Sequence, residues 1–404
     1  MADLNTIRSR RKWVTSFALG ILLFGLGAGA FAQFQVHQRA GWLSITWLLT
    51  AGPSLKAQIQ AGLDAETASN TNIPGQILHV TAPSLSLDHT FVSGTGLLPA
   101  DDVRVASNIK TFIAASALIL VEDGRLELDA PIASYLSGRV RRILIKAERK
   151  IDEITLRQLL NHSSGIADYA SSEAFQILAY VPTAFGLAWH WTPEDQLWFA
   201  ANLTPKRPVG ARFDYSDTNY LIAADMIAKA TNSANAGVAL RTLLDWPALG
   251  ASTTFWEFYE PTPTSTRRVR QFRGAIEDTN IDVSFDQYGG GGLVMSMADL
   301  AHAHGAVVRG GVFANGATTL AIMQTAGTAP GSNGYGLGIA PLMIEGETCW
   351  SHGGRWGTVA LHCPAINLTV ARSWGQSNAT PDLQDSKGIV VGLVRLAKFA
   401  VPTK

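Results

Sequence analysis

The sequence has little charge and no excess of either sign. Charged residues make up 16% of its 404 residues, 32 Lys and Arg balance 32 Asp and Glu, and apolar residues make up 47%. A nucleic-acid binder would show a basic excess, and a disordered tail would combine low hydrophobicity with high net charge. The composition argues against both classes and is typical of a globular protein with a sizeable core. We therefore expect no nucleic-acid partner.

Motifs of several common enzyme classes are also missing. The chain has no G-x-S-x-G nucleophile elbow, no H-E-x-x-H, and no G-x-G-x-x-G or P-loop. His302 and His304 lie close to Asp299 in the sequence, but residues two apart on a helix do not share a face. We accordingly predict neither a metal site nor a cofactor.

Cysteine is nearly absent, since only Cys349 and Cys363 occur. They lie on either side of a Gly-rich segment. If this segment turns a hairpin centred near Trp356, the two residues face each other across adjacent strands at a bridging distance. An oxidising compartment would permit a disulfide, and two buried thiols are the alternative. Neither cysteine lies in a motif that would make it a nucleophile.

The N-terminus has the composition of an export signal. Basic residues at positions 8, 10, 11 and 12 precede an uncharged stretch, 13–32, that ends Ala-Phe-Ala. This stretch is also about long enough for an uncleaved anchor, since roughly 20 apolar residues span a bilayer; a buried core helix is the remaining interpretation. We predict a signal peptide or anchor at 1–32, a linker at 33–53, and one domain at 54–404. The domain would be periplasmic or extracellular.

Strand patterns occupy both ends of the predicted domain, and helical patterns occupy its middle. Strands are predicted at 76–82, 85–92, 335–342, 349–353, 359–363 and 367–373. Helices are predicted at 53–65, 107–123, 155–162, from 192, at 220–230 and at 383–400. The pattern predicts an α/β (α+β) fold: an antiparallel sheet built from both chain ends, flanked by helices, with a helical lobe inserted in the middle.

Ser107 and Lys110 begin one of these predicted helices. Their spacing projects a hydroxyl and an amine from the same helix face. A serine hydroxyl needs an adjacent base to become a nucleophile, and a lysine held among apolar residues can lose its proton and serve as one. The helix N-terminus also favours a developing oxyanion. Taken alone, Ser-x-x-Lys arises by chance, with an N-capping serine and an exposed lysine as the simple alternative.

Several segments in a fixed order give this pair its context. The stretch VASNIKTFIAASALILVEDGRLELDAPIASY at 105–135 resembles the nucleophile helix of the family of class C β-lactamases, D-alanyl-D-alanine carboxypeptidases and related esterases. Similar to further family elements are LLNHSSGI at 159–166, FDYSDTNY at 213–220, GGLVMSMADL at 291–300 and WSHGG at 350–354. The resemblance to these penicillin-recognising serine hydrolases covers residues 54–400.

The resemblance implies a role for each matching residue. Ser107 would attack a carbonyl carbon and become acylated. Tyr215 would accept the Ser107 proton as a phenolate or relay it, while Lys110 keeps the phenol acidic or acts as the base itself. His352 occupies the strand position where many β-lactamases have lysine. The amide of Arg355, together with that of Ser107, would form the oxyanion hole.

Two glycines and an arginine complete the predicted substrate site. Gly353 and Gly354 on a strand indicate the close approach of a backbone or ligand. The side chain of Arg355 would either contact a substrate carboxylate or lie in solvent. Asp217 stands where the family's Tyr-x-Asn element has asparagine. A carboxylate beside Lys110 would favour the charged ammonium, and a plain turn or cap role is the alternative.

The histidine at position 352, where many β-lactamases have lysine, narrows the expected class of substrate. His352 removes a permanent positive charge that would hold the carboxylate of a penicillin or peptide. We therefore expect a metal-independent acyl transfer to water from an ester or a D-alanyl-D-alanine-type peptide. The alternatives are a class C-like β-lactamase and a non-hydrolysing penicillin-binding sensor or scaffold. We predict a small-molecule or peptide substrate as the partner of this protein. The segment 13–32 could in addition anchor the protein to a membrane.

Overall fold

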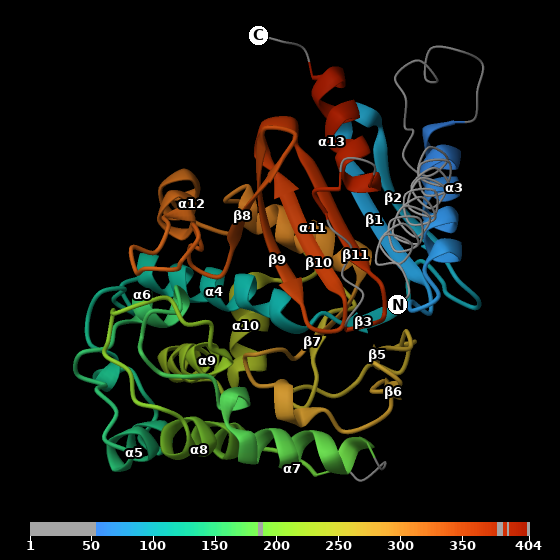
Figure 1. Ribbon diagram of the computed structural model, residues 1–404. Coiled ribbons are helices and arrows are strands. Elements are labelled where there is room, and N and C mark those ends of the chain that lie inside the picture. The colour runs from blue at the N-terminus through green and yellow to red at the C-terminus, as the bar shows by residue number, and fades with distance from the viewer. Residues whose placement is uncertain (1–53, 185–188, 378–382, 386–387, 402–404) are drawn as a thin grey trace, which may run out of the picture.

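The computed structural model describes residues 54–184, 189–377, 383–385 and 388–401. Its main sheet is antiparallel and has the strand order β2-β1-β11-β10-β9-β8 (Figure 1). The strands are β1 (Gln76–Ala82), β2 (Leu87–Ser93), β8 (Ala340–Ile344), β9 (Glu347–Gly354), β10 (Thr358–Cys363) and β11 (Leu368–Ser373). The first and last of them, β1 and β11, pair in the middle of the sheet, which confirms the prediction of a sheet built from both chain ends.

Helices cover both faces of this sheet and form a lobe beside it (Figure 1). They are α3 (Leu55–Ser69), α4 (Ile109–Glu122), α5 (Gly138–Lys146), α6 (Leu156–Leu160), α7 (Glu173–Ala184), α8 (Pro193–Leu203), α9 (Asp217–Thr231), α10 (Ala236–Leu244), α11 (Met297–Val308), α12 (Gly316–Gln324) and α13 (Ile389–Ala400). Helices α3 and α13 pack on one face of the sheet, and α11 packs on the other. The lobe, α5 to α10, comes from the middle of the chain, as predicted.

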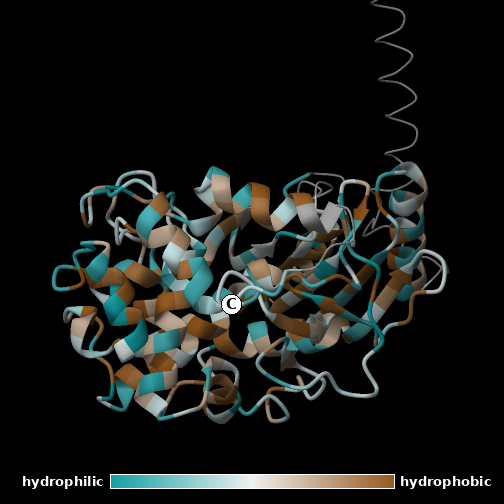
Figure 2. Cartoon of the chain, turned by 90° about the horizontal axis from the view of Figure 1, so that it is seen from below, coloured by the Kyte–Doolittle hydropathy of each residue, from teal (hydrophilic) through white to brown (hydrophobic). Residues whose placement is uncertain are grey.

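The alternation of residues along β1 explains these two layers. Leu78 and Val80 belong to the apolar cluster with α3 and α13, whereas Ile77 belongs to the larger cluster with α4 and α11. Successive side chains of a strand point to opposite faces, so one strand can supply both cores. In Figure 2, hydrophobic and hydrophilic residues lie side by side along the helices, as expected for helices with one face against a core.

A small second sheet brings the active-site segments together. It contains β3 (Asp102–Arg104), β7 (Leu293–Ser296) and β4 (Phe255–Trp256), in the order β3-β7-β4. The chain leaves β3 toward Ser107 and enters β7 from the glycine run at 289–292. Because β3 and β7 pair, Ser107 and the glycine run are held close together. A two-stranded ribbon consists of β5 (Phe272–Arg273) and β6 (Ile276–Glu277).

One predicted strand was placed too early. Residues 335–339, expected to open the strand 335–342, form a loop, and β8 begins only at Ala340. Gly338 has a left-handed φ of 74°, and a Cβ there would lie 2.5 Å from the Lys110 carbonyl oxygen. Its own carbonyl accepts a hydrogen bond from the hydroxyl of Thr111 at 2.9 Å. The loop therefore packs on α4, and this contact with a distant helix delays the start of the strand.

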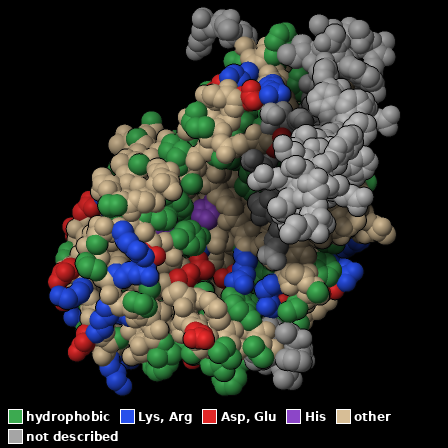
Figure 3. Space-filling model, viewed as in Figure 1, with side chains coloured by type: hydrophobic (Ala, Val, Ile, Leu, Met, Phe, Trp, Pro, Cys, Tyr) green, Lys and Arg blue, Asp and Glu red, His purple; other side chains and the backbone are tan. Residues whose placement is uncertain are grey.

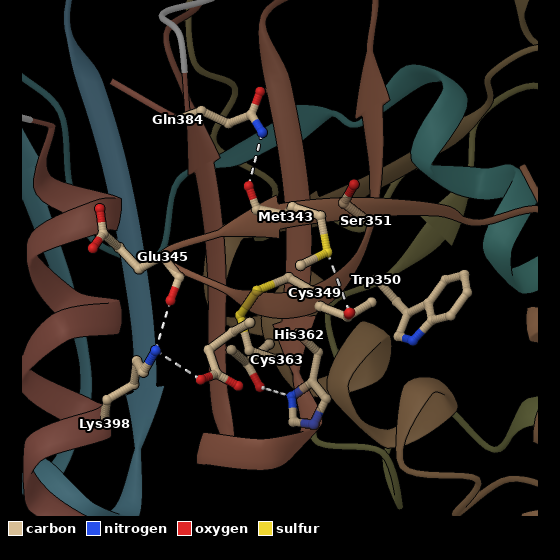
Figure 4. The surroundings of a disulfide bond; sticks show 12 residues. Met343, Glu345, Cys349, Trp350, Ser351, His362, Cys363, Gln384 and Lys398 are labelled. Atoms are coloured by element: carbon tan, nitrogen blue, oxygen red, sulfur yellow. Dashed lines mark hydrogen bonds and ion pairs between the residues drawn. A yellow bond between two sulfur atoms is a disulfide. The ribbon is translucent and has the colours of Figure 1, made fainter. Parts of the chain in front are cut away.

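The two cysteines form a disulfide between β9 and β10 (Figure 4). Their Cα atoms are 4.0 Å apart, and the intervening turn is centred on Trp356. Beside the disulfide, Lys398 of α13 makes an ion pair with Glu347 at 3.0 Å. The disulfide and the ion pair thus fix β9 to its neighbour and to the covering helix.

The predicted export segment at 1–32 and the linker at 33–53 lie outside the described residues. Within the part that the structure describes, none of the helices combines the length and the apolar character that a bilayer crossing requires.

Candidate active site

Ser107 lies in a strained turn just before the central helix α4. The chain passes Ala106 with a left-handed φ of 48° and makes a short 3₁₀ turn, η2 (Ala106–Asn108). Ser107 therefore precedes α4 rather than opening it, which corrects the predicted helix start. A non-glycine residue in this conformation costs of order 1–3 kcal/mol and persists only where packing holds it. Such packing comes from Gly354 of β9, where a Cβ would lie 2.3 Å from the Val105 carbonyl oxygen.

Lys110 points from the first turn of α4 toward Ser107. Its Nζ donates to Ser107 Oγ at 2.9 Å and to the Gly290 carbonyl at 2.8 Å. The Ser107 hydroxyl also lies 3.1 Å from the same carbonyl. A Cβ at Gly290 would lie 2.8 Å from the Asp217 carboxylate, so a side chain there would disrupt the site. The sequence did not single out Gly290, although the run of four glycines was an available signal.

Lys110 is completely buried, and Asp217 is its counter-ion. The side chain of Lys110 is 0% exposed and that of Asp217 is 13% exposed, and Nζ lies 2.6 Å from Oδ1. Asp217 Oδ1 makes no hydrogen bond within the described residues, so its contact with Lys110 is an ion pair. Asp217 is also the first residue of α9, where the helix dipole favours a negative charge. The structure thus supports both interpretations of Asp217.

Tyr215 reaches Ser107 from the segment before α9. Lys110 Nζ lies 5.1 Å from the centre of the Tyr215 ring. Burial and then the Asp217 carboxylate raise the pKa of Tyr215 well above its usual value. Solvent moderates the effect of burial, because Tyr215 is 37% exposed. The direction nevertheless disfavours a phenolate, so of the two expected roles of Tyr215, a relay fits this geometry better.

His162 positions Tyr215, although the sequence only placed it inside a family-like segment. The two rings are 4.2 Å apart between centres, at an angle of 34°. His162 Nδ1 accepts a hydrogen bond from the Ser216 amide at 3.1 Å. Burial, and then the charge of Lys110, lowers the pKa of His162 well below its usual value. A neutral imidazole therefore packs against the tyrosine ring and holds the backbone beside it.

His352 faces the site from β9 and is held as a neutral group. Its Nδ1–H donates to the Gly353 carbonyl at 2.8 Å, which leaves Nε2 to accept from the Tyr335 hydroxyl at 3.0 Å. Burial, and then the charge of Lys110, lowers the pKa of His352 to about 3. The site therefore has no positive charge at this strand position at neutral pH. Tyr335 is a site residue that the sequence placed only in a predicted strand.

Gly353, Gly354 and Arg355 follow His352 at the end of β9. A Cβ at Gly354 would lie 2.2 Å from the Thr358 hydroxyl, whereas one at Gly353 would meet only a carbonyl oxygen at 3.8 Å. The protein itself therefore approaches Gly354 closely, whereas the space beside Gly353 is open.

Arg355 does not lie free in solvent, contrary to one of the two expectations for it. Its guanidinium donates to the Tyr180 hydroxyl at 2.6 Å and lies 4.8 Å from the centre of that ring. The negative charge of Asp286 raises the pKa of Arg355, against the opposing effect of burial. Tyr180, from α7, is a further residue that sequence patterns did not reveal.

Asp286 adds a buried carboxyl group to the same region. It is 6% exposed, and its carboxylate makes no hydrogen bond within the described part of the chain. Burial, and then the charge of Asp217, raises the pKa of Asp286. The same two causes, in the same order, raise the pKa of Asp168. Figure 3 shows a hollow between the sheet and the helical lobe, with histidine, acidic and basic side chains gathered beside it.

The residues around Ser107 do not form a metal site. Among the described residues, one group of three could offer metal ligands, and it contains none of the residues around Ser107. The arrangement at Ser107 instead provides a hydroxyl, an amine at hydrogen-bond distance, and a tyrosine beside them. This is the set of groups that nucleophilic acyl transfer requires.

Comparison with known proteins agrees with this geometry. The Beta-lactamase family model matches residues 102–388, so the chain belongs to the beta-lactamase family. The fold and the neighbours described below place it among the serine hydrolases of that fold, as the resemblance implied. The substrate type is left open by this assignment.

Three relatives illustrate the family. The putative penicillin-binding protein PbpX of Bacillus subtilis (strain 168) is 25% identical over 249 residues, which are 60% of this chain and 55% of that protein. This chain thus spans about half the length of that relative. A D-stereospecific amidohydrolase from Streptomyces sp. has a TM-score of 0.67 and 25% identity, over 80% of this chain and 94% of that one. D-amino acid amidase from Ochrobactrum anthropi SV3 has a TM-score of 0.65 and 20% identity, over 86% of this chain and 98% of that one.

Proposed function

We propose that this protein hydrolyses the amide, peptide or ester bond of a D-amino-acid derivative through an acyl-enzyme on Ser107. The observation that carries the proposal is the 2.9 Å contact between Ser107 Oγ and the buried Lys110 Nζ. Ser107 Oγ attacks the carbonyl carbon, the amine or alcohol leaves, and water releases the acyl group. The amides of Ser107 and Arg355 stabilise the oxyanion, because η2 and the end of β9 lie against each other.

Lys110 accepts the Ser107 proton in this proposal, and Tyr215 relays it to the leaving group. The raised pKa of Tyr215 makes it a proton carrier rather than a base. Asp217, 2.6 Å from Lys110 Nζ, balances the charge that Lys110 acquires together with this proton.

The charges of the pocket favour a substrate with a free amino group. His352 is neutral, so no positive charge holds a carboxylate at the strand. Asp286 is nearly buried and has no hydrogen-bond donor among the described residues, and a substrate ammonium would supply one. The likeness to a D-stereospecific amidohydrolase and a D-amino acid amidase supports the same substrate class.

A hydrolysis panel tests the proposal. D-alanine amide, L-alanine amide, D-alanyl-D-alanine peptides, a nitrophenyl ester and a chromogenic cephalosporin would be compared, with Ser107→Ala as the blank. We expect turnover of the D-amide, the D-peptide or the ester, and slower turnover of the cephalosporin. Faster turnover of the cephalosporin would identify a β-lactamase instead. Stable labelling by penicillin without turnover of any substrate would identify a sensor.

Asp286 gives a sharper test of the amino-group preference. The variant Asp286→Asn would be compared with the unchanged protein on D-alanine amide and on its N-acetyl derivative. We expect kcat/KM to decrease at least tenfold for the free amine and to change little for the acetylated compound. An equal decrease for both compounds would contradict a contact with the substrate amino group.

Export stays part of the proposal. The stretch 13–32 has the composition of a signal or anchor, and a disulfide such as Cys349–Cys363 persists in oxidising compartments. Fractionation of the producing cells, with a thiol-trapping reagent, would locate the protein. Recovery in the cytoplasm with both thiols reduced would refute export.

A further inference from the structure

Three potential metal ligands from distant parts of the sequence meet at one side of the main sheet. They are His79 of β1, Asp88 of β2 and His302 of α11, and their ligand atoms lie within 4.8 Å of one another. His79 Nε2 and His302 Nε2 each lie 3.0 Å from Asp88 Oδ1. The two imidazole rings are 5.0 Å apart and nearly perpendicular, so both present Nε2 to the same carboxylate.

The other nitrogen of each ring is already oriented. His79 Nδ1 lies 2.8 Å from the Thr90 hydroxyl, and His302 Nδ1 lies 3.3 Å from the Gly250 carbonyl oxygen. Metal-binding histidines usually donate their second ring N–H to such a partner, which fixes the tautomer and the ring orientation. Both rings are thus held with Nε2 toward Asp88.

The carbonyl of Gly250 makes the arrangement more specific. A carbonyl oxygen only accepts, so the contact with His302 requires a proton on Nδ1. In this tautomer the lone pair of His302 Nε2 faces the Asp88 carboxylate oxygen, 3.0 Å away, as in a ring that shares a metal ion with that carboxylate.

The distances and the ligand types fit a small divalent ion. Ligand atoms about 2.0–2.1 Å from a tetrahedral zinc lie roughly 3.3 Å from one another. The two nitrogen–oxygen distances of 3.0 Å are close to this value. Imidazole with one carboxylate suits first-row transition metals such as Zn²⁺ better than Mg²⁺ or Ca²⁺. The Asp88 side chain is 61% exposed and that of His302 is 30% exposed, so an ion can enter from solvent.

We propose that His79, Asp88 and His302 bind one divalent transition-metal ion, with Zn²⁺ as the expected ion and solvent as the fourth ligand. The ion would join α11 to the β1–β2 hairpin. Because α11 packs against the main sheet and follows directly after β7, the ion stabilises the junction of the two sheets. It takes no part in the chemistry at Ser107.

No sequence pattern indicated this group. The sequence offered His302 together with His304 and Asp299, and these three do not meet at one point. His304 Nε2 donates to the Trp350 carbonyl at 3.0 Å, and Asp299 accepts from the Thr253 amide at 2.9 Å. The partners that His302 does have lie more than two hundred residues away, in a hairpin that only the fold brings near.

Zinc binding by the full-length protein tests the proposal. The protein would be stripped with a chelator, dialysed, and titrated with ZnCl₂ by calorimetry; Co²⁺ absorption would report the ligand geometry. We expect one equivalent of Zn²⁺, a tetrahedral Co²⁺ spectrum and a rise of several degrees in the unfolding midpoint. Failure of the stripped protein to bind Zn²⁺ stoichiometrically would overturn the proposal.

Variants locate the ion. His302→Ala and Asp88→Ala should each weaken Zn²⁺ affinity at least tenfold, while labelling of Ser107 by a fluorophosphonate shows that each variant is folded. His89→Ala is the matched control, because His89 is adjacent to Asp88 but packs against Phe91. Unchanged affinity in both site variants, or an equal loss in the control, would overturn the assignment.

Discussion

The two polar clusters of this protein differ in burial and in how their charge is balanced. The cluster at Ser107 is centred on Lys110, which is 0% exposed and is neutralised by Asp217 at 2.6 Å. The cluster at His79 contains Asp88, whose side chain is 61% exposed, so water can compensate its charge. A buried charge without a partner costs several kcal/mol, whereas an exposed one costs little. The first cluster must therefore be complete within the protein, and the second can leave a ligand position open.

The clusters also differ in backbone strain. Two residues of the first region, Ala106 and His162, have left-handed φ values of 48° and 58° without being glycine. None of the three ligand residues of the second cluster does. Strained residues of this kind gather where geometry must be held for chemistry. The comparison indicates that the first cluster is built for a reaction and the second for structure, and the following variants test this division.

The largest effect is expected from Ser107→Ala. Loss of the nucleophile should abolish labelling by fluorophosphonate and reduce kcat/KM by about 10³-fold or more, while Zn²⁺ binding stays unchanged. Ser116→Ala on the same helix is the control, because the buried Ser116 hydroxyl makes no hydrogen bond within the described residues. Equal labelling of Ser107→Ala and the unchanged protein would refute the nucleophile assignment.

Lys110→Met should affect both activity and stability. Removing the amine takes away the proton acceptor, and kcat/KM should decrease at least about 10²-fold. It also leaves Asp217 nearly buried without a counter-ion, which should cost roughly 3 kcal/mol of unfolding free energy. The double variant Lys110→Met/Asp217→Asn should regain most of the stability and none of the activity. Denaturant unfolding and ester hydrolysis measure the two effects; a double variant as unstable as the single one would contradict the ion pair.

Acid should destabilise the protein through buried His304, which lies on α11 between the two clusters. Burial lowers the pKa of His304 to about 4, from an unfolded value near 6.5. The unfolded chain therefore takes up a proton first as pH falls, and stability is lost between pH 6.5 and about 4. The full difference between the folded and unfolded pKa of His304 corresponds to about 3 kcal/mol of unfolding free energy. His304→Gln should flatten the stability profile in this window; an unchanged slope would show that His304 does not contribute.

The smallest effect is expected from His352→Lys. A permanent positive charge at this strand position should hold the carboxylate of a β-lactam and increase acylation by a cephalosporin about tenfold. His352→Gln, which adds no charge, is the control. The two variants should hydrolyse the nitrophenyl ester at similar rates. Identical cephalosporin reactivity in both variants would show that charge at this position does not select the substrate.

Local patterns were sufficient for most of the fold. The predicted strand 76–82 coincides with β1, and the capping pattern at Thr155 begins α6 as expected. The strand expected from 335 began late because Gly338 packs against α4, a contact more than two hundred residues distant in sequence. Periodicity describes a segment by its own residues, and cannot report which distant element will interrupt it.

The candidate site was partly predictable for the same reason. Ser107, Lys110, Tyr215 and His352 each stand in a short segment with a family pattern, and the structure brings all four together. His162 and Tyr335 lie in segments that were noted but not assigned to the site. Tyr180 and Asp286 lie in no sequence pattern that predicts a site residue, because they reach the pocket only through the packing of α7 and of the loop before β7.

The sequence by itself determined the class of chemistry, because a serine, a lysine and their ordered companion segments are local features of the chain. It also determined that both chain ends build one sheet, because alternation along a strand is local too. Only the tertiary structure decided that Asp217 neutralises Lys110, that Tyr215 is held protonated, and that His79 meets Asp88 and His302. Charge balance, burial and ligand geometry depend on which distant residues become neighbours, and that is settled only when the layers pack.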